Sequence, residues 1–178
     1  ESKKIILTVT ASKNNIARIL KFSLSLDLSD VSYDGIIFSD PTKKFWNLEC
    51  SDAFKIGNKY YLTYSANGCW DKYYNVCYAV SDSPLGNFVK PYHPGKTWTN
   101  LLLGFPGDSN TGSKVYKQWS GFASGTGHHC FFNVGNEVMI GYHAHQNRDW
   151  NSDSAYTRRY VAIDYLHFDK DGVPFVNG

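Results

Sequence analysis

The sequence lacks a long apolar run, since no stretch approaches the roughly 18 to 20 residues that a membrane span requires. Residues 1–12 also lack the small-residue cleavage site of a signal peptide. The charge excess is small: among 178 residues, 18 Lys and Arg stand against 16 Asp and Glu, for a net charge of +2. We therefore expect a soluble chain that binds neither a membrane nor a nucleic acid, because nucleic-acid binding requires clustered basic surface.

Cysteine is also scarce, and no two cysteines stand in a CxxC pair. The four are Cys50, Cys69, Cys77 and Cys130. This spacing argues against a zinc ribbon and against thioredoxin-type redox chemistry. A disulfide between Cys69 and Cys77 stays open, and so does the redox compartment.

Aromatic residues, in contrast, are abundant. They make up 16% of the chain, with 13 Tyr, 11 Phe and 5 Trp, and aromatic rings suit both pleated sheets and contacts with sugar rings. Helix-period patterns are scarce, whereas short alternating runs bounded by Gly, Asn, Asp and Pro recur. We predict an all-β chain with strands at Lys4–Ala11, Ile16–Leu24, Ala53–Ile56, Lys59–Ser65, Asn75–Ser81, His129–Val134, Glu137–His143 and Arg159–Phe168.

Two of the expected hairpins belong to an internal repeat. Residues 54–66 align without a gap on residues 132–144, with five of thirteen positions identical, and each copy contains a Gly-Asn turn. A third copy starts at Ile6–Ser12, which resembles Tyr61–Asn67, but it lacks the preceding strand and hairpin. Because propellers carry four to eight blades, we predict that this chain is the C-terminal part of a larger propeller.

The repeat also divides the chain into expected units. We predict a partial blade at 1–46, a blade at 47–92, an insertion or connection at 93–127 and the last blade at 128–178. Together they supply about the last two and a half to three blades of one catalytic propeller domain.

Four blocks of sequence resemble the C-terminal half of glycoside hydrolase family 43, in the family's order: Glu49–Ser65, Tyr78–Phe88, Gly125–His129 and Arg159–Asp164. The resemblance implies a five-bladed β-propeller and hydrolysis with inversion. It also implies plant pentose polymers as substrates, either arabinan (α-1,5-linked L-arabinose) or xylan. We expect a secreted or periplasmic location.

Inverting glycosidases need a carboxylic acid and a carboxylate base, and the resemblance implies that Glu49 is the acid. In the family the base and a second aspartate come from the first two blades, which this chain does not contain. We therefore expect the chain alone to be inactive and its partner to be the N-terminal half of the same propeller, present as a second chain. Four aspartates precede Glu49 and are interpreted as turn residues: Asp27, Asp30, Asp34 and Asp40.

His128 is the candidate metal residue. The resemblance implies that it lies near the bottom of the central channel and faces a hydrated calcium ion, although calcium prefers oxygen ligands. The neighbouring glycines would let the backbone crowd the ring axis. A zinc cluster of His128, His129, His143 and His145 is an alternative, but no HExxH motif supports it, and hydrogen-bonded histidines at a strand end are preferred.

Arg159 and Trp70 are the candidate substrate-binding residues. The resemblance implies that Arg159 projects into the pocket, where its donors suit sugar hydroxyls. Trp70 lies in loop-like sequence and has a ring that can stack on a pentose. Three alternatives stay open: a non-catalytic carbohydrate-binding propeller, a protein-binding scaffold, and a β-xylosidase or α-L-arabinofuranosidase of the same family.

Overall fold

Every regular element that the computed structural model describes is a β-strand, which confirms the all-β prediction. The described residues are 3–14, 16–40, 48–69, 73–91, 100–104, 107–108, 113–114, 124–145 and 159–177. Within these ranges no helix has the length and apolar character needed to cross a bilayer.

The strands form three main antiparallel sheets in which consecutive strands are neighbours. The first contains β1 (Ile5–Lys13), β2 (Ile16–Leu24) and β3 (Val31–Asp40). The second contains β4 (Leu48–Ile56), β5 (Lys59–Ala66), β6 (Asn75–Ser81) and β7 (Leu101–Leu103). The third contains β10 (Ser124–Val134), β11 (Glu137–His145), β12 (Arg159–Phe168) and β13 (Pro174–Asn177). A two-stranded sheet pairs β8 (Gly107–Asp108) with β9 (Ser113–Lys114).

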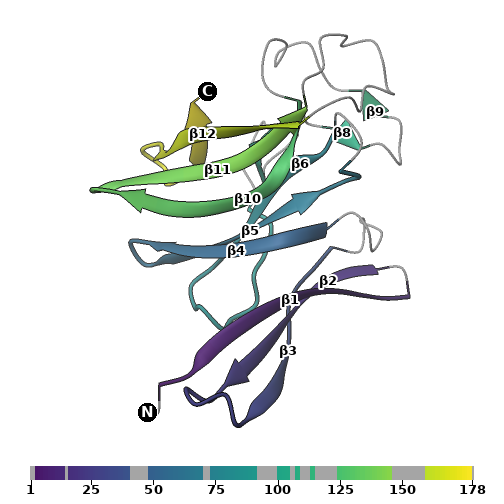
Figure 1. The fold of residues 1–178 in the computed structure, drawn as a ribbon, viewed down its shortest axis with the longest axis vertical. Helices are drawn as coiled ribbons and strands as arrows, with labels where there is room; N and C mark the ends of the chain where they lie inside the picture. The colour runs from purple at the N-terminus through teal and green to yellow at the C-terminus, as the bar shows by residue number, and fades with distance from the viewer. Residues whose placement is uncertain are drawn as a thin grey trace.

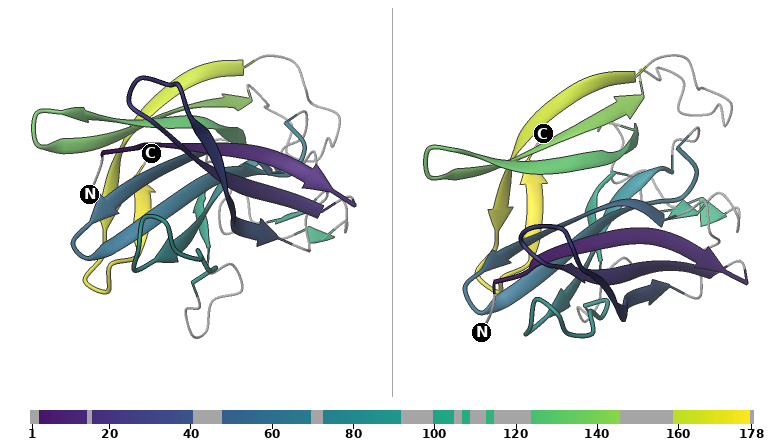
Figure 2. Two further views of the ribbon diagram at one scale, coloured as in Figure 1. Left: turned by 90° about the horizontal axis from the view of Figure 1, so that it is seen from below. Right: turned by 60° about the horizontal axis from the view of Figure 1, so that its bottom comes forward.

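The three sheets follow one another in chain order from the bottom to the top of the molecule in Figure 1, and Figure 2 shows the same succession from two other sides. Apolar side chains fill the two spaces between them. Ile19, Phe38, Leu62 and Phe88 belong to the core of the first and second sheets. The core of the second and third sheets contains Tyr61, Tyr78, Ile140, Tyr142 and Leu166.

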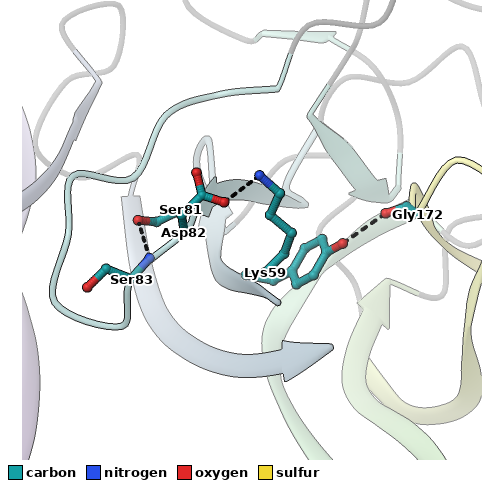
Figure 3. A network of polar contacts seen from close by, with 6 residues as sticks. Lys59, Ser81, Asp82, Ser83 and Gly172 are labelled. Carbon is teal, nitrogen blue, oxygen red and sulfur yellow. Dashed lines mark hydrogen bonds and ion pairs between the residues drawn. The ribbon is translucent and has the colours of Figure 1, made fainter. Parts of the chain in front are cut away.

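The segment after β6 fastens the first sheet to the second. Phe88 is buried and its backbone N–H donates to the Ile37 carbonyl at 3.0 Å, while Lys21 Nζ donates to the Leu85 carbonyl at 3.1 Å. At the same end of β5 and β6, a hydrogen bond from the Tyr61 hydroxyl to the Gly172 carbonyl joins the second sheet to the third, near the exposed pair Lys59 and Asp82 (Figure 3).

The internal repeat extends further in the structure than in the sequence. Gly57 and Gly135 open the two predicted hairpin turns with φ of 56° and 61°. A β-bulge interrupts β4 between Glu49 and Asp52, and the equivalent bulge interrupts β10 between Gly127 and Cys130. Cys50 and His128 occupy the same place in these bulges, with φ of 49° and 50°.

Several boundaries differ from the prediction. The second sheet continues past residue 92, because β7 pairs with β6, and β10 starts at Ser124, before residue 128. Asp27 is confirmed as a turn residue, since its carboxylate accepts hydrogen bonds from Ser25 and Ser29. For Asp34 and Asp40 the turn interpretation is wrong, because both lie within strand β3. The four cysteines form no disulfide.

Candidate active site

The antiparallel direction of consecutive strands brings the candidate residues together at one end of the second and third sheets. In an antiparallel meander the start of one strand lies beside the end of the next. The starts of β4 and β6 therefore adjoin the end of β5, and the starts of β10 and β12 adjoin the end of β11. Cross-sheet hydrogen bonds hold β4 beside β10: Cys50 Sγ donates to the His129 carbonyl at 3.3 Å, and the Phe131 N–H donates to Asp52 Oδ2 at 3.1 Å.

Glu49 lies at the start of β4, next to the bulge, and its side chain is half-buried. The hydroxyl of Tyr74, which directly precedes β6, donates a hydrogen bond to Glu49 Oε1 at 2.7 Å. Tyr74 itself is 0% exposed. Burial, and then the bond to Glu49, raise the pKa of the Tyr74 phenol well above its ordinary value, so the phenol stays protonated and acts as the donor.

Two glycines of the Gly125–His129 block make room for aromatic rings. A Cβ on Gly127 would lie 2.0 Å from Cε1 of Tyr74, and a Cβ on Gly125 would lie 2.3 Å from Nδ1 of His145. Both distances are shorter than any real contact. The small residues therefore serve the packing of Tyr74 and His145, which is a more specific reason than the predicted crowding at a ring axis.

His129 joins β10 to β5 through buried hydrogen bonds. Thr63 Oγ1 donates to the Asp52 carbonyl at 3.1 Å, so it accepts a hydrogen bond from His129 Nε2, 2.8 Å away. His129 Nδ1 lies 3.4 Å from Ser65 Oγ. Burial, with a smaller effect of His128, lowers the pKa of His129 to about 4, and the ring is therefore neutral at pH 7.

His143 lies in a stack of rings. Its ring is 5.4 Å from that of Tyr74 at an interplanar angle of 17°, and 6.1 Å from that of His145 at 9°. Within the described part of the chain, its buried Nε2 has no hydrogen-bond partner. Burial, followed by the nearby Arg159 cation, lowers the pKa of His143 to about 4.

The Cys69 carbonyl receives two donors from the third sheet. His145 Nε2 and Arg159 Nη2 each lie 3.0 Å from this oxygen, so both nitrogens donate to it. Arg159 is exposed at the start of β12. The guanidinium therefore holds the chain segment that follows β5 while one face of the side chain remains open to solvent.

The side chain of His128 is exposed, and its backbone N–H donates to Ser65 Oγ at 2.8 Å. Its ring lies 6.4 Å from that of His143. Among the described residues, no three His, Cys, Asp or Glu side chains converge as metal ligands. The described side chains therefore lack the cluster of ligands that a zinc site uses. Toward a calcium ion the exposed His128 offers one imidazole nitrogen, whereas calcium prefers oxygen ligands.

The comparison with known families decides the family. The sequence model of glycosyl hydrolases family 43 matches residues 8–174. The chain belongs to this family. The search of curated proteins found no match.

Solved structures of glycan-degrading enzymes have a similar fold. A thermostable family-43 glycoside hydrolase is 26% identical, with a TM-score of 0.67 over 98% of this chain and 53% of its own. An α-L-arabinanase of Cellvibrio cellulosa, complexed with arabinohexaose, is 17% identical with a TM-score of 0.60 over 96% and 56%. An endo-1,4-β-xylanase of Bacteroides thetaiotaomicron is 21% identical with a TM-score of 0.54 over 100% and 60%.

This family 43 chain thus spans little more than half the length of the solved structures it matches. Its three main sheets correspond to blades of the five-bladed β-propeller. As predicted, it supplies about the last two and a half to three blades.

The structure brings Glu49, His128 and Arg159 to the same end of the sheets, whereas Trp70 lies outside the described residues. Sequence reasoning missed Tyr74. The repeat offset of 78 pairs residue 49 with Gly127, so it marks the two strand starts as equivalent, but it does not point to Tyr74. The contact of Tyr74 with the Gly127 position is a finding of the structure.

Proposed function

We propose that the complete protein is an inverting glycoside hydrolase that cleaves arabinan or a related plant pentose polymer. In this proposal Glu49 is the general acid, and the general base lies in the part of the propeller outside this chain. The observation that carries the proposal is the place of Glu49 in a family 43 chain: a half-buried carboxyl at a bulged strand start, hydrogen-bonded through one oxygen. Bulges recur next to active sites, where they re-aim side chains.

The proposed chemistry needs two carboxyl groups about 6.5 to 9.5 Å apart. Glu49 donates its proton to the glycosidic oxygen as the C1–O bond breaks and its electron pair moves to that oxygen. The base removes a proton from a water molecule, whose oxygen bonds to C1 from the opposite face. Glu49 ends the step as a carboxylate, and the sugar has inverted its configuration.

Arg159 and Trp70 are proposed to bind the sugar. Arg159 is exposed at the same end of the sheets as Glu49, and guanidinium donors suit the hydroxyl groups of a sugar. The Gly125–His129 block favours arabinan over xylan, because it resembles arabinan-cleaving members. The similar solved structures include both an arabinanase and an endo-1,4-β-xylanase, so the preference for arabinan rests on this block.

A calcium ion near His128 is also part of the proposal. With one imidazole and no cluster of three His, Cys, Asp or Glu ligands among the described residues, such an ion would be held mainly through water molecules and would exchange readily. Chelation and His128→Ala should then each lower the melting temperature and should not add to each other. Unchanged melting in both would remove calcium from the account.

The test of the function is Glu49→Gln in the protein that carries all five blades. General acid catalysis contributes about 10²- to 10⁴-fold, so turnover of arabino-oligosaccharides should fall by that range. Turnover of 4-nitrophenyl glycosides should fall far less, because their leaving group needs little protonation. The control is Glu137→Gln, which changes an exposed glutamate at the start of β11 and should leave both rates unchanged.

Equal losses on both substrate classes would contradict the proton-donor role. Binding of pentose oligomers without any turnover would instead support the alternative of a non-catalytic carbohydrate-binding propeller. Xylosides and arabinofuranosides in the same assay distinguish the arabinanase from the β-xylosidase and α-L-arabinofuranosidase alternatives.

A further inference from the structure

We propose that Tyr74 is a positioning residue for the general acid. Its hydroxyl donates a hydrogen bond to Oε1 of Glu49, so that Oε2 carries the proton to the leaving oxygen. The inference rests on the proposed function of Glu49. It starts from one contact, the 2.7 Å hydrogen bond between these two side chains, which lie 25 positions apart in the sequence.

The direction of this hydrogen bond is fixed by the surroundings of Tyr74. The side chain is fully buried, and its phenol keeps its proton across the working range of pH. A protonated carboxyl has one oxygen that bears hydrogen and one that accepts hydrogen bonds. Because Tyr74 donates to Oε1, the proton of Glu49 belongs on Oε2.

The contact persists through the proposed reaction. Once Oε2 has given its proton to the glycosidic oxygen, Glu49 is a carboxylate, and the bond from Tyr74 becomes charge-assisted and stronger. No other proton needs to move within the pair. Tyr74 therefore favours the product state of the acid without taking part in the transfer, which is why it is a positioning residue.

Two strands of the third sheet fix the ring of Tyr74. Gly127 on β10 leaves the space that the ring edge fills, and His143 on β11 stacks against its face at 5.4 Å. These two residues belong to the third sheet, whereas Glu49 belongs to the second and Tyr74 directly precedes its strand β6, so the orientation of Glu49 depends on how the two sheets pack.

The alternative is that Tyr74 is a buried tyrosine that merely satisfies its hydroxyl. The two accounts differ in what the loss of one oxygen atom does to catalysis. Tyr74→Phe keeps the ring between Gly127 and His143, so the fold and the binding of sugar should survive. A purely structural hydroxyl would affect every substrate alike, whereas a positioning hydroxyl matters only when the acid must deliver a proton.

The experiment measures kcat and KM of Tyr74→Phe in the five-bladed protein with arabino-oligosaccharides and with 4-nitrophenyl arabinofuranoside. We expect kcat for the oligosaccharides to fall about tenfold, within the contribution of general acid catalysis, with KM little changed. The activated glycoside should lose less than about threefold. Tyr64→Phe is the matched control, because Tyr64 is equally buried and its hydroxyl accepts a bond from Asn100 at 2.9 Å, with no contact to Glu49 in the described structure.

Combination with Glu49→Gln separates this inference from the function on which it rests. The double variant should be no slower than Glu49→Gln alone, because the effects of substitutions at neighbouring residues that act as a unit do not add. Equal losses on both substrates, or full additivity, would overturn the role of Tyr74 while a leaving-group-dependent Glu49→Gln kept the proposed function intact. A Glu49→Gln effect independent of the leaving group would overturn both.

Gly127→Ala, which crowds the ring of Tyr74, should reproduce the selectivity of Tyr74→Phe, and an unselective loss in that variant would count against the inference.

Discussion

At the residue scale, the environment of His129 makes a charged imidazole unfavourable. Nε2 donates to Thr63, Nδ1 faces Ser65, and the ring is buried between β5 and β10. These contacts use a neutral ring with its hydrogen on Nε2. The pKa of His129 therefore falls from an ordinary value of 6.5 to about 4.

This lowered pKa predicts that acid destabilises the fold. The unfolded chain binds a proton to His129 below pH 6.5, while the folded chain resists protonation down to about pH 4. The stabilisation is therefore complete above pH 6.5 and is lost as the pH falls toward 4. Between pH 7.5 and pH 5 we expect His129 to account for about 2 kcal/mol of lost unfolding free energy.

Urea denaturation at the two pH values, with a chelator present throughout, measures the effect. His129→Gln keeps an N–H donor but cannot titrate, so its unfolding free energy should depend less on pH than that of the wild type. His167→Gln is the control, on β12 outside the candidate site. If His129→Gln kept the full pH dependence of the wild type, the buried neutral histidine would not be its cause.

At the scale of elements, two lysine–aspartate pairs of similar geometry should differ in their contribution to stability. Lys90 Nζ lies 2.6 Å from Oδ2 of Asp40 on β3, whose side chain is 1% exposed. The pair of Lys59 and Asp82 is exposed at 55% and 83%. Lys90 therefore pairs with a buried carboxylate, whereas Lys59 pairs with an exposed one, and the loss of a partner costs more for a buried charge.

We expect Lys90→Met to lower the unfolding free energy by about 2 to 3 kcal/mol and Lys59→Met by less than about 1 kcal/mol. Lys90 is itself 38% exposed, which places the expected loss at or below the lower end of the range for buried pairs. Chemical denaturation of the two variants gives the comparison. Equal losses would show that the buried carboxylate of Asp40 does not depend on Lys90.

At this scale, the sequence predicted some of the strands and missed others. Hairpins with a Gly-Asn turn between alternating strands are local signals, and both were predicted correctly. Strand β3 was missed, because Asp34 and Gly35 interrupt its apolar pattern and its irregular register with β2 needs the partner strand to be recognised. Strand β7 is only three residues long, and β13 begins with Pro174, so neither gives a pattern of period two.

For the candidate site, too, the sequence indicated some residues and missed another. The resemblance to the family indicated Glu49, His128 and Arg159, and these residues do lie at one end of the sheets. The contacts of Tyr74 with Glu49 and Gly127 arise from the antiparallel pairing of the strands and from two bulges. No local pattern encodes such contacts, because Tyr74 is 25 positions from Glu49 in the sequence and Gly127 belongs to another sheet.

At the scale of the whole molecule, both outer sheets present apolar faces to solvent. On β1, Ile5, Leu7 and Val9 are 40%, 46% and 37% exposed. On β12, Val161 and Ile163 are 79% and 56% exposed. Contiguous exposed apolar surface of this kind marks an interface, and we propose that the N-terminal half of the propeller covers both faces, across more than the roughly 1,600 Å² of a standard complex.

In the proposed function, Glu49 of this chain is the general acid, and the general base lies in the blades that this chain does not contain. The most direct measurement is the release of arabinose oligomers from debranched arabinan by this chain, with and without the polypeptide that carries the remaining blades. The account predicts no hydrolysis by the chain alone, hydrolysis when both parts are present, and loss of that hydrolysis with Glu49→Gln. Reassembled blades that bind arabinan without cleaving it, or cleavage that does not need Glu49, would contradict the account.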